Sequence, residues 1–350
     1  MNHTHAIETA DPSDAQTHEP VIRLVAVVVT FNRKAQLERT LAALLAEPAQ
    51  NLAAVLVVDN ASDDGTGAWL DGLDAPRLCV LRMPRNLGGA GGFEAGMRHA
   101  IQVLDPDWIV VMDDDAHPEP GALAAFHAAD LAGWDAAAAA VYHPDGRICQ
   151  MNRPTLNPFW HFGVLLRTAL GGGRGAFHLG ARAYSRQAPV RAVDGASFVG
   201  LFLSRGAIER AGYPDAALFV YGDDAIYTLG LTAAGERIGF FPAIRFSHDS
   251  ETLGADDGRF RPLWKVYYYH RNLLILYRMA AGWLFWPVLL VVLPRWLMRL
   301  RSHRGERRAF LRLLWDAVRD GLRRRVRIDH ASVLARAGTP PGKRQPRLID

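Results

Sequence analysis

The chain has 350 residues, of which 49% are hydrophobic and 22% charged, a balance typical of folded globular proteins. The formal net charge is only +4 and the excess of arginine collects toward the C-terminal end, which argues against a general affinity for nucleic acid. Two cysteines without Cys-x-x-Cys spacing exclude a disulfide framework and a zinc site, and favour a reduced, cytoplasmic compartment.

The N-terminal residues are polar and carry no chemistry that the sequence identifies. Residues 1–20 lack the apolar stretch of a signal peptide, so we expect a disordered tail there rather than secretion. A second tail is expected at residues 338–350.

Strands and helices alternate along the first third of the chain. Short apolar runs rich in valine predict buried strands at residues 21–30, 53–58, 78–81 and 108–112. Helices are predicted between them, one with leucines at positions 37, 41, 44 and 45, one around Ala68, and one at residues 88–103. This alternation predicts an α/β fold with a Rossmann-like, mostly parallel sheet flanked by helices.

Later elements are predicted less regularly. Residues 197–204 and 238–241 read as strands, and residues 226–234 suit a helix.

In a parallel sheet, ligands bind beyond the carboxyl ends of the strands. Polar clusters follow three of the predicted strands at Thr30, Asn32 and Arg33, at Asp59 and Asn60, and at Asp113, Asp114 and Asp115.

The three adjacent aspartates form the strongest chemical signal. Such carboxylates repel one another unless a cation compensates, and their oxygens suit Mg²⁺ or Mn²⁺ together with a diphosphate. If strand geometry persists, Asp113 and Asp115 project to one side as metal ligands. Asp114 then projects to the other side, where it could bind a hydroxyl of the donor. The alternative is an acidic helix N-terminus, since Pro118 and Glu119 follow.

A nucleotide site is predicted from two weaker motifs. Asp59 can accept hydrogen bonds from a base or ribose, although Asp59-Asn60 is also ordinary turn chemistry. The stretch Asn86-Leu87-Gly88-Gly89 lets the backbone approach a nucleotide closely, but it matches neither a P-loop nor a dinucleotide fingerprint.

A second acidic pair and one histidine complete the candidate site. Asp224 is the candidate base that removes the proton of an acceptor hydroxyl, with Asp223 contacting acceptor hydroxyls. The alternative role is helix capping, which accounts for one aspartate more naturally than for two. His248 follows a strand and would be a third metal ligand, or a structural histidine.

These motifs together resemble the family-2 glycosyltransferases of the GT-A fold over residues 21–251. The residues that carry the resemblance are Val57-Val58-Asp59-Asn60, Asn86-Leu87-Gly88-Gly89, Met112-Asp113-Asp114-Asp115 and Gly222-Asp223-Asp224. The Asn-Leu-Gly-Gly and Gly-Asp-Asp strings are most similar to the galactofuranosyltransferase and rhamnosyltransferase branch. This chain has Gly222 and Ile226 where similar galactofuranosyltransferases tend to carry Trp and Glu, so we expect different acceptor contacts.

The resemblance implies a role for each matched residue. Thr30, Arg33, Asp59 and Asn86 would hold the nucleotide, with Asn32, Asn60, Gly88, Gly89 and Asp114 at the same donor site. Asp113, Asp115 and His248 would bind Mn²⁺ or Mg²⁺, and Asp224 would be the base. The implied activity is inverting transfer of a galactofuranose- or rhamnose-class sugar from a UDP- or dTDP-sugar to a glycan or lipid-linked acceptor in cell-envelope polysaccharide synthesis.

The C-terminal third, residues 252–337, is predicted to be helical, amphipathic and basic. The apolar residues 283–294 are too few to span a bilayer, which needs about 20. A helix lying in the membrane interface, followed by an arginine-rich helix at residues 295–327, therefore predicts association with an anionic membrane at its cytoplasmic face. The alternative is a buried helical hairpin or a contact in a homo-oligomer.

Two other functions fit parts of the pattern. A sugar-phosphate nucleotidyltransferase also uses paired acids and Mg²⁺, but it normally has a basic glycine-rich loop after the first strand. A non-catalytic glycan- or nucleic-acid-binding module would use the basic C-terminal residues. No nucleic-acid motif accompanies them, and the acidic clusters would repel a polyanion, so no nucleic-acid partner is expected.

Overall fold

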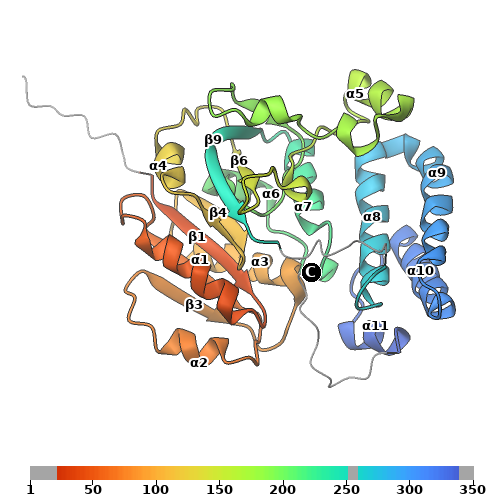
Figure 1. Ribbon diagram of the computed structural model, residues 1–350, viewed down its shortest axis with the longest axis horizontal. Helices are drawn as coiled ribbons and strands as arrows, with labels where there is room; N and C mark the ends of the chain where they lie inside the picture. The colour runs from red at the N-terminus through yellow and green to blue at the C-terminus, as the bar shows by residue number, and fades with distance from the viewer. Residues whose placement is uncertain (1–21, 251–258, 339–350) are drawn as a thin grey trace, which may run out of the picture.

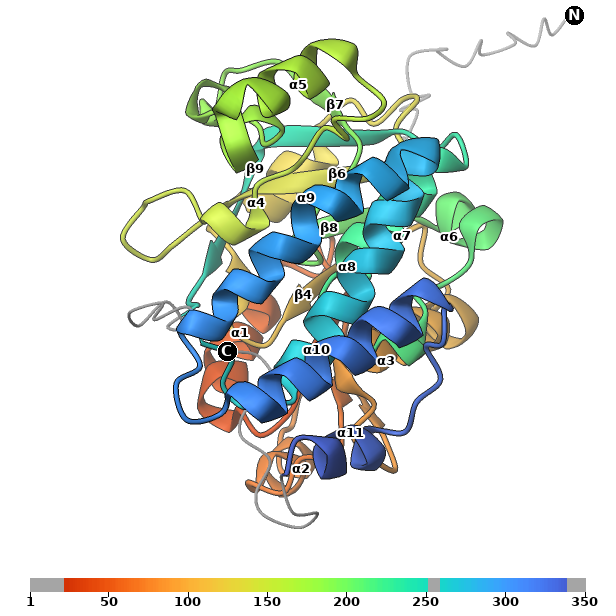
Figure 2. The same ribbon diagram turned by 90° about the vertical axis from the view of Figure 1, so that its right-hand side faces the viewer.

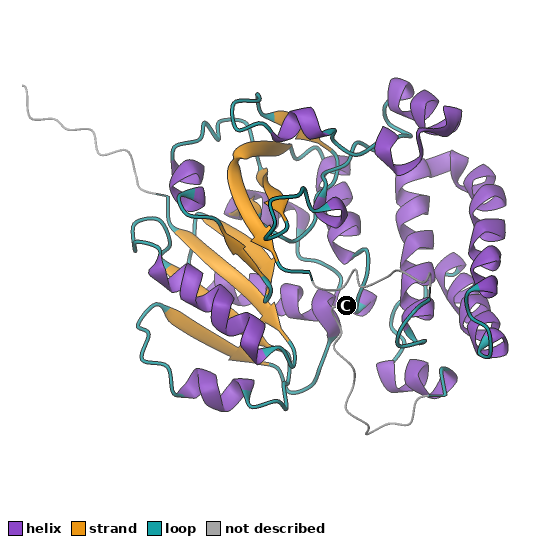
Figure 3. Cartoon of the chain, in the orientation of Figure 1, coloured by secondary structure: helices purple, strands orange, loops and turns teal. Residues whose placement is uncertain are grey.

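The computed structural model describes residues 22–250 and 259–338 (Figures 1 and 3). The predicted tail at residues 1–20, the domain boundary at residue 251 and all of the C-terminal tail except Gly338 lie outside the described residues. The strands are β1 (Leu24–Thr30), β2 (Ala54–Asp59), β3 (Leu78–Arg82), β4 (Trp108–Asp113), β5 (Ala116–Pro118), β6 (Ala136–Tyr142), β7 (Arg191–Val193), β8 (Leu201–Ser204) and β9 (Ile238–His248).

The helices connect these strands and then continue beyond the sheet. They are α1 (Lys34–Ala46), α2 (Thr66–Asp71), α3 (Gly88–His99), α4 (Ala122–His127), α5 (Phe162–Arg167), α6 (Arg205–Ala211), α7 (Asp223–Ala233), α8 (Lys265–Ala281), α9 (Phe285–Met298), α10 (Arg307–Leu322) and α11 (His330–Arg336). The predicted helix at residues 88–103 is divided into α3 and a π-helical turn at Ala100–Leu104.

A single mixed sheet forms the centre of residues 22–248. Its strand order is β3-β2-β1-β4-β8-β6-β9-β5, with β7 paired to β9. The first four strands are parallel, as the sequence predicts. Antiparallel strands β5, β7 and β8 make the other half mixed, where a mostly parallel sheet was expected.

Helices can cover both faces of the sheet because the central strands carry apolar residues on both sides. In β1, Val25, Val27 and Val29 pack on the side of α3, while Leu24 and Val28 belong to the core on the side of α1. The run of valines is therefore buried on both sides, which is the pattern expected of a central parallel strand.

Strand β6 was missed by the sequence analysis. Its residues Ala136–Tyr142 are all buried between β8 and β9, but five of the seven are alanine. Alanine favours helices when considered alone, and here burial on both faces decides the conformation instead. The predicted strand at residues 197–204 is shorter than expected, because only Leu201–Ser204 pairs in the sheet.

The C-terminal helices α8 to α11 form a helical unit with an apolar core of its own (Figure 1). Phe31, Phe219 and Val220 from the sheet domain belong to the same core, so the helical unit packs directly against the carboxyl ends of the strands. The predicted arginine-rich helix at residues 295–327 is wrong as a single element. The chain turns between residues 302 and 306, where Gly305 adopts a φ of 90°.

Among the described residues, one helical stretch, Lys265–Arg301, is long and apolar enough by composition to cross a membrane. Gly282, with a φ of 52°, divides this stretch into α8 and α9, which lie side by side as a hairpin (Figures 1 and 2). Helix α9 has 14 residues, and at about 1.5 Å per residue it extends over only about 21 Å. That length is less than the hydrocarbon thickness of about 30 Å.

Candidate functional site

Three potential metal ligands meet at the carboxyl end of β4. Asp113, Asp115 and His248 offer ligand atoms that all lie within 4.8 Å of one another. Asp113 ends β4, and the antiparallel pairing of β5 with β9 sets Ala116 opposite His248. The backbone N–H of Asp249 also donates to the carbonyl of Asp115 at 2.9 Å. The fold thus brings together the three residues that the sequence suggested as ligands.

His248 is oriented as a metal-binding histidine would be. Its Nδ1 lies 2.8 Å from Oδ1 of Asn152, which can only accept, so Nδ1 carries the proton and donates. In the neutral imidazole, Nε2 then directs its lone pair toward the carboxylates, and it lies 3.1 Å from Oδ1 of Asp115. Within residues 22–250 and 259–338, neither of these buried atoms has a hydrogen-bond partner of good geometry. Two carboxylates and an imidazole in this arrangement fit a divalent cation.

The charges of the cluster favour a bound cation. Burial, together with repulsion by Asp115, raises the pKa of Asp113 to about 7. Burial alone would lower the pKa of His248, but contact with Asp115 and Cys149 and the charge of Asp113 raise it to about 10. The cluster therefore attracts positive charge, which a divalent ion supplies more fully than a proton.

Asn152 supports His248 from a turn that the sequence analysis did not single out. Its Nδ2 donates to Oγ of Ser197 at 2.9 Å, which fixes the amide so that Oδ1 faces the imidazole. Asn152 is buried, in the short helix Gln150–Asn152. No local sequence pattern marks it, because its partners come from β9 and from the segment before β8.

We predict that Asn152→Ala weakens Mn²⁺ binding about 10- to 100-fold, the usual effect of removing a group that orients a metal-bound histidine. Calorimetric titration of the purified protein with Mn²⁺ measures this directly. The exposed neighbour Gln150→Ala is the matched control and should bind Mn²⁺ normally. An Asn152→Ala protein that is less stable but has unchanged Mn²⁺ affinity would show that Asn152 is structural only.

Arg33 and Asp114 are buried beside the candidate metal ligands and interact with each other. The Arg33 guanidinium lies 2.8 Å from Oδ2 of Asp115 and 3.3 Å from Oδ1 of Asp114. The hydroxyl of Thr30 donates to Oδ2 of Asp114 at 2.7 Å, and the hydroxyl of Thr40 donates to its backbone carbonyl. Asp114 is 0% exposed.

The carboxylate of Asp114 is thus enclosed by protein, where the sequence assigned it to a donor hydroxyl. Burial raises its pKa to about 8 despite the attraction of Arg33. Its hydrogen bond with Thr30 and its ion pair with Arg33 hold both residues beside the candidate metal ligands. The sequence could not reveal this, because Asp114 is 84 residues from Thr30 along the chain.

The loops after β1, β2 and β3 are tied together on the predicted donor side. Oδ1 of Asn32 accepts from the N–H of Asp63 at 2.8 Å, and Oδ1 of Asp59 accepts from the N–H of Ser62 at 2.9 Å. Nδ2 of Asn60 donates to the carbonyl of Gly88 and to Oδ1 of Asn86. Only 1% of Asn60 is exposed, so this side chain supports the loop of Asn86 and Gly88 from the protein interior.

Asn86 and Gly89 retain the capacity to contact a ligand. Nδ2 of Asn86 is buried and has no hydrogen-bond partner among the described residues. A Cβ added to Gly89 would meet nothing within 4 Å, so its backbone faces open space. At Gly88, by contrast, a Cβ would lie 2.0 Å from the carbonyl oxygen of Phe219 at a φ of 73°. Gly88 is thus required for packing, and Gly89 is the glycine that a nucleotide can approach.

Asp223 and Asp224 begin α7 beside the candidate metal ligands. Gly222, in the left-handed region with a φ of 74°, turns the chain into the helix. Burial raises the pKa of Asp223 to about 8 and that of Asp224 to about 6. The charge of Asp224 raises the pKa of Asp113, and the charge of Asp113 raises the pKa of Asp223. Asp223 is buried and Asp224 is half-buried, which leaves Asp224 as the more accessible of the two.

Helix α8 fixes the loop that leads to these aspartates. The amide of Asn272 donates to the carbonyls of Leu218, Val220 and Tyr221, and the buried Arg271 donates to Ala217 and Leu218. The C-terminal helices thereby hold the segment that carries the candidate base. The sequence predicts a membrane-associating role for this region, with a buried helical hairpin or an oligomer contact as the alternative, and neither of these includes support of the site.

Three features together define a GT-A glycosyltransferase. They are the parallel half of the sheet with its connecting helices, the Asp-Asp-Asp sequence at the end of β4 and the histidine at the end of β9. A solved structure described as GalNAc-T7 with UDP, GalNAc and Mn²⁺ has this fold, at a TM-score of 0.50 and 13% identity, over 73% of this chain and 48% of that one. At this identity the likeness concerns the fold alone.

Residues 25–188 match the family model described as glycosyl transferase family 2. The galactofuranosyltransferase GlfT1 of Mycolicibacterium smegmatis is 29% identical over 71% of this chain and 75% of that protein. Galactofuranosyltransferase GlfT1 of Mycobacterium tuberculosis is 30% identical over 68% of this chain and 72% of that protein. The chain belongs to glycosyl transferase family 2, which confirms the resemblance seen in the motifs.

Proposed function

We propose that this enzyme transfers a sugar of the galactofuranose or rhamnose class, with inversion, from a UDP- or dTDP-sugar to a hydroxyl of a glycan or lipid-linked acceptor in cell-envelope synthesis. One observation supports this proposal most directly. Asp113, Asp115 and His248 lie together beside the N-terminus of α7, which carries Asp224. The similarity to galactofuranosyltransferases supports the sugar class. Family membership favours this function over the nucleotidyltransferase and binding-module alternatives.

The residues of the site suit each part of that reaction. Asn86, Gly89 and Asp59 would bind and orient the nucleotide of the donor, while Thr30, Arg33 and Asp114 hold the metal ligands in place. A divalent ion held by Asp113, Asp115 and His248 would neutralise the charge that develops on the departing diphosphate.

Asp224 would then accept the proton of the acceptor hydroxyl as its oxygen attacks the anomeric carbon. The bond from that carbon to the diphosphate oxygen breaks in the same step, so the new bond forms on the opposite face and the configuration inverts. A pKa of about 6 leaves Asp224 ionised at neutral pH and able to accept this proton. Asp223, which is buried, would orient the loop and contact the acceptor.

The donor assignment predicts metal-dependent thermal stabilisation. A ligand that binds only the native state raises the melting temperature by mass action. We expect UDP or dTDP to raise it by several degrees with Mn²⁺ and by much less without, measured by differential scanning fluorimetry. GDP serves as the nucleotide control. The absence of a Mn²⁺-dependent shift with either nucleotide would contradict the assignment of the donor site.

We further propose that residues 21–251 form the catalytic domain, that residues 252–337 form a helical region, and that the enzyme acts in the cytoplasm at the inner face of the cell membrane. The core shared by Phe31, Phe219 and Val220 with the C-terminal helices supports a fixed relation between the two parts. A lipid-linked acceptor would make this location useful, because both substrates could reach the site from one side.

A further inference from the structure

Three segments of the chain expose large apolar side chains to solvent. In and around α5, Phe162 is 80% and Leu170 is 78% exposed. On the α8–α9 hairpin, Trp283 is 85% and Leu290 is 79% exposed, and on α10 Trp315 is 69% exposed. Further exposed apolar residues on the same segments are Trp160, Leu166, Trp286, Val291, Leu297, Met298 and Leu311. Soluble proteins rarely leave so many of these side chains together in water without a partner.

The three segments lie on one face of the molecule. Figure 2 shows α5, α9 and α10 on the side turned toward the viewer, with α9 across the middle. The insertion that carries α5 is attached to the hairpin, because Nδ2 of the buried Asn157 donates to the carbonyl of Ala280 at 3.0 Å. The exposed apolar residues of α5 and α9 are thus parts of one surface, which we call the docking face: the exposed side chains of residues 160–174 and 283–315.

The docking face is strongly basic as well as apolar. Residues 160–174 of this face carry the exposed Arg167 and Arg174 and contain no aspartate or glutamate. Five exposed arginines follow α9 at positions 301, 304, 307, 308 and 312. None of these five forms an ion pair with a carboxylate of residues 22–250 or 259–338. Their positive charge is therefore available to an anionic partner.

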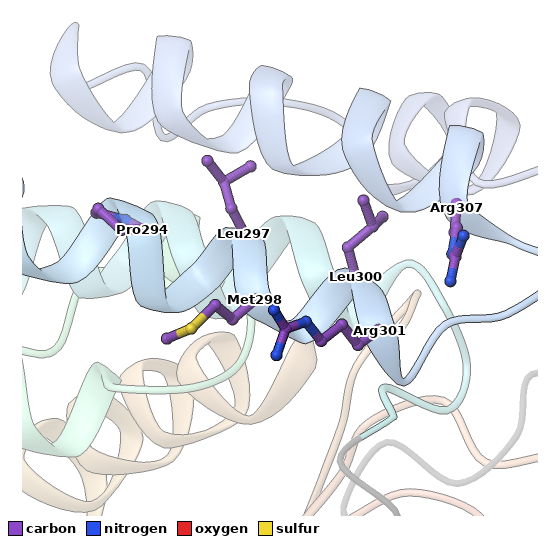
Figure 4. A pocket seen from close by; sticks show the side chains of 6 residues that line it. All are labelled: Pro294, Leu297, Met298, Leu300, Arg301 and Arg307. Atoms are coloured by element: carbon purple, nitrogen blue, oxygen red, sulfur yellow. The ribbon is translucent and has the colours of Figure 1, made fainter.

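A hollow at the C-terminal end of α9 is lined by both apolar and basic side chains. It has a volume of about 460 Å³ and is lined by Pro294, Leu297, Met298, Leu300, Arg301 and Arg307. Figure 4 shows Leu297 and Leu300 projecting from one side of the helix, and Met298 and Arg301 from another. An apolar lining with two guanidinium groups fits the chemistry of a phospholipid, whose acyl chain is apolar and whose phosphate is negative.

We propose that the docking face binds an anionic phospholipid bilayer through α5, α9 and α10 together, with α9 lying in the interface. The charge of the face favours a bilayer over a second copy of the chain, since a two-fold interface would bring identical arginine clusters together. At about 21 Å, α9 is too short to span the hydrocarbon and long enough to lie within the headgroup region. Aromatic and arginine side chains are the types that such an interface retains.

This arrangement brings the catalytic site close to the bilayer. The carboxyl ends of β1 and β4 point toward the C-terminal helices (Figure 1), and Asn272 of α8 holds the loop before Asp223. An acceptor anchored in the membrane would approach Asp224 from the helical side. This consequence rests on the proposed function, whereas bilayer binding itself does not.

Flotation of the full-length protein with vesicles tests the inference. The vesicles are phosphatidylcholine alone or mixed with phosphatidylglycerol, at low and high salt. We expect flotation with the anionic vesicles at low salt, and much less with neutral vesicles or high salt. Two double variants, Phe162→Ser with Leu170→Ser and Trp286→Ser with Leu290→Ser, should each reduce the bound fraction at least about tenfold. Val103→Ser, at a 62% exposed apolar residue outside the docking face, should not.

Several results would overturn the proposal. Equal flotation with neutral and anionic vesicles would show that the arginines do not contribute to binding. Normal binding by the α5 variant would show that α5 is not part of the docking face. Dimerisation through α9, seen by light scattering without vesicle binding, would assign the face to a second copy. Mn²⁺-dependent stabilisation by nucleotide, measured on the same variants, reports on the donor site separately and should stay normal in all of them.

Discussion

Replacement of the candidate base, Asp224→Asn, is expected to lower kcat about 10²- to 10⁴-fold, the range usual for a positioned general base. The amide has nearly the shape of the carboxylate but cannot accept the proton of the acceptor hydroxyl. Its Oδ1 can still accept from the N–H of Ala225, as the carboxylate does at 2.6 Å, so α7 should begin as in the unmodified protein. Transfer assays with a UDP- or dTDP-sugar measure the effect.

Two further measurements make this test specific. Mn²⁺-dependent nucleotide binding should be retained by Asp224→Asn, and the exposed Asp74→Asn should transfer sugar normally. In the unmodified enzyme, kcat should fall as the pH drops below about 6, because burial raises the pKa of Asp224 to about that value and protonation removes the base. An Asp224→Asn protein with normal kcat would refute the assignment of this residue.

The parallel half of the fold was predictable because its information is local. In β1 and β2, buried valines follow one another along the chain, and short polar turns mark where each strand ends. The strand ends could therefore be located to within a few residues, and the parallel arrangement then implied that their polar residues meet. Asp113 and Asp59 were found in this way.

The other half depends on contacts between distant segments. The poly-alanine strand β6 has no strand propensity of its own, and β5 has only three residues. His248 comes close to Asp113 and Asp115 only because β5 pairs with β9. Spacing alone left His248 open as a ligand, and only the family resemblance pointed to its role.

The detailed roles within the site were the least predictable. Asp113, Asp114 and Asp115 are chemically equal in the sequence, yet the structure gives them different environments. Thr30 and Arg33 enclose the carboxylate of Asp114, while Asp113 stays half-buried. These differences arise from side chains more than 80 residues away, for which the sequence carries no nearby signal.

Removal of one proposed metal ligand, Asp113→Asn, should abolish Mn²⁺-dependent stabilisation by nucleotide and lower transfer about 10³-fold or more, because the charge on the leaving diphosphate would no longer be neutralised. Asp113 is the ligand to replace, since Asp115 also holds Arg33 and its loss would disturb the loop after β1. Titration calorimetry with Mn²⁺ and melting with nucleotide give readouts that do not depend on activity.

The metal-free protein should respond to the same substitution in the opposite direction. Burial and Asp115 raise the pKa of Asp113 from 3.8 to about 7, so its ionisation destabilises the folded state as the pH rises through that value. The neutral amide avoids this loss, and metal-free Asp113→Asn should therefore melt at or above the temperature of the unmodified protein at pH 8. Asp74→Asn should leave both metal binding and melting unchanged. If Asp113→Asn instead lowered the metal-free melting temperature and still bound Mn²⁺, Asp113 would be a structural residue, and the cation would have to be held by other groups.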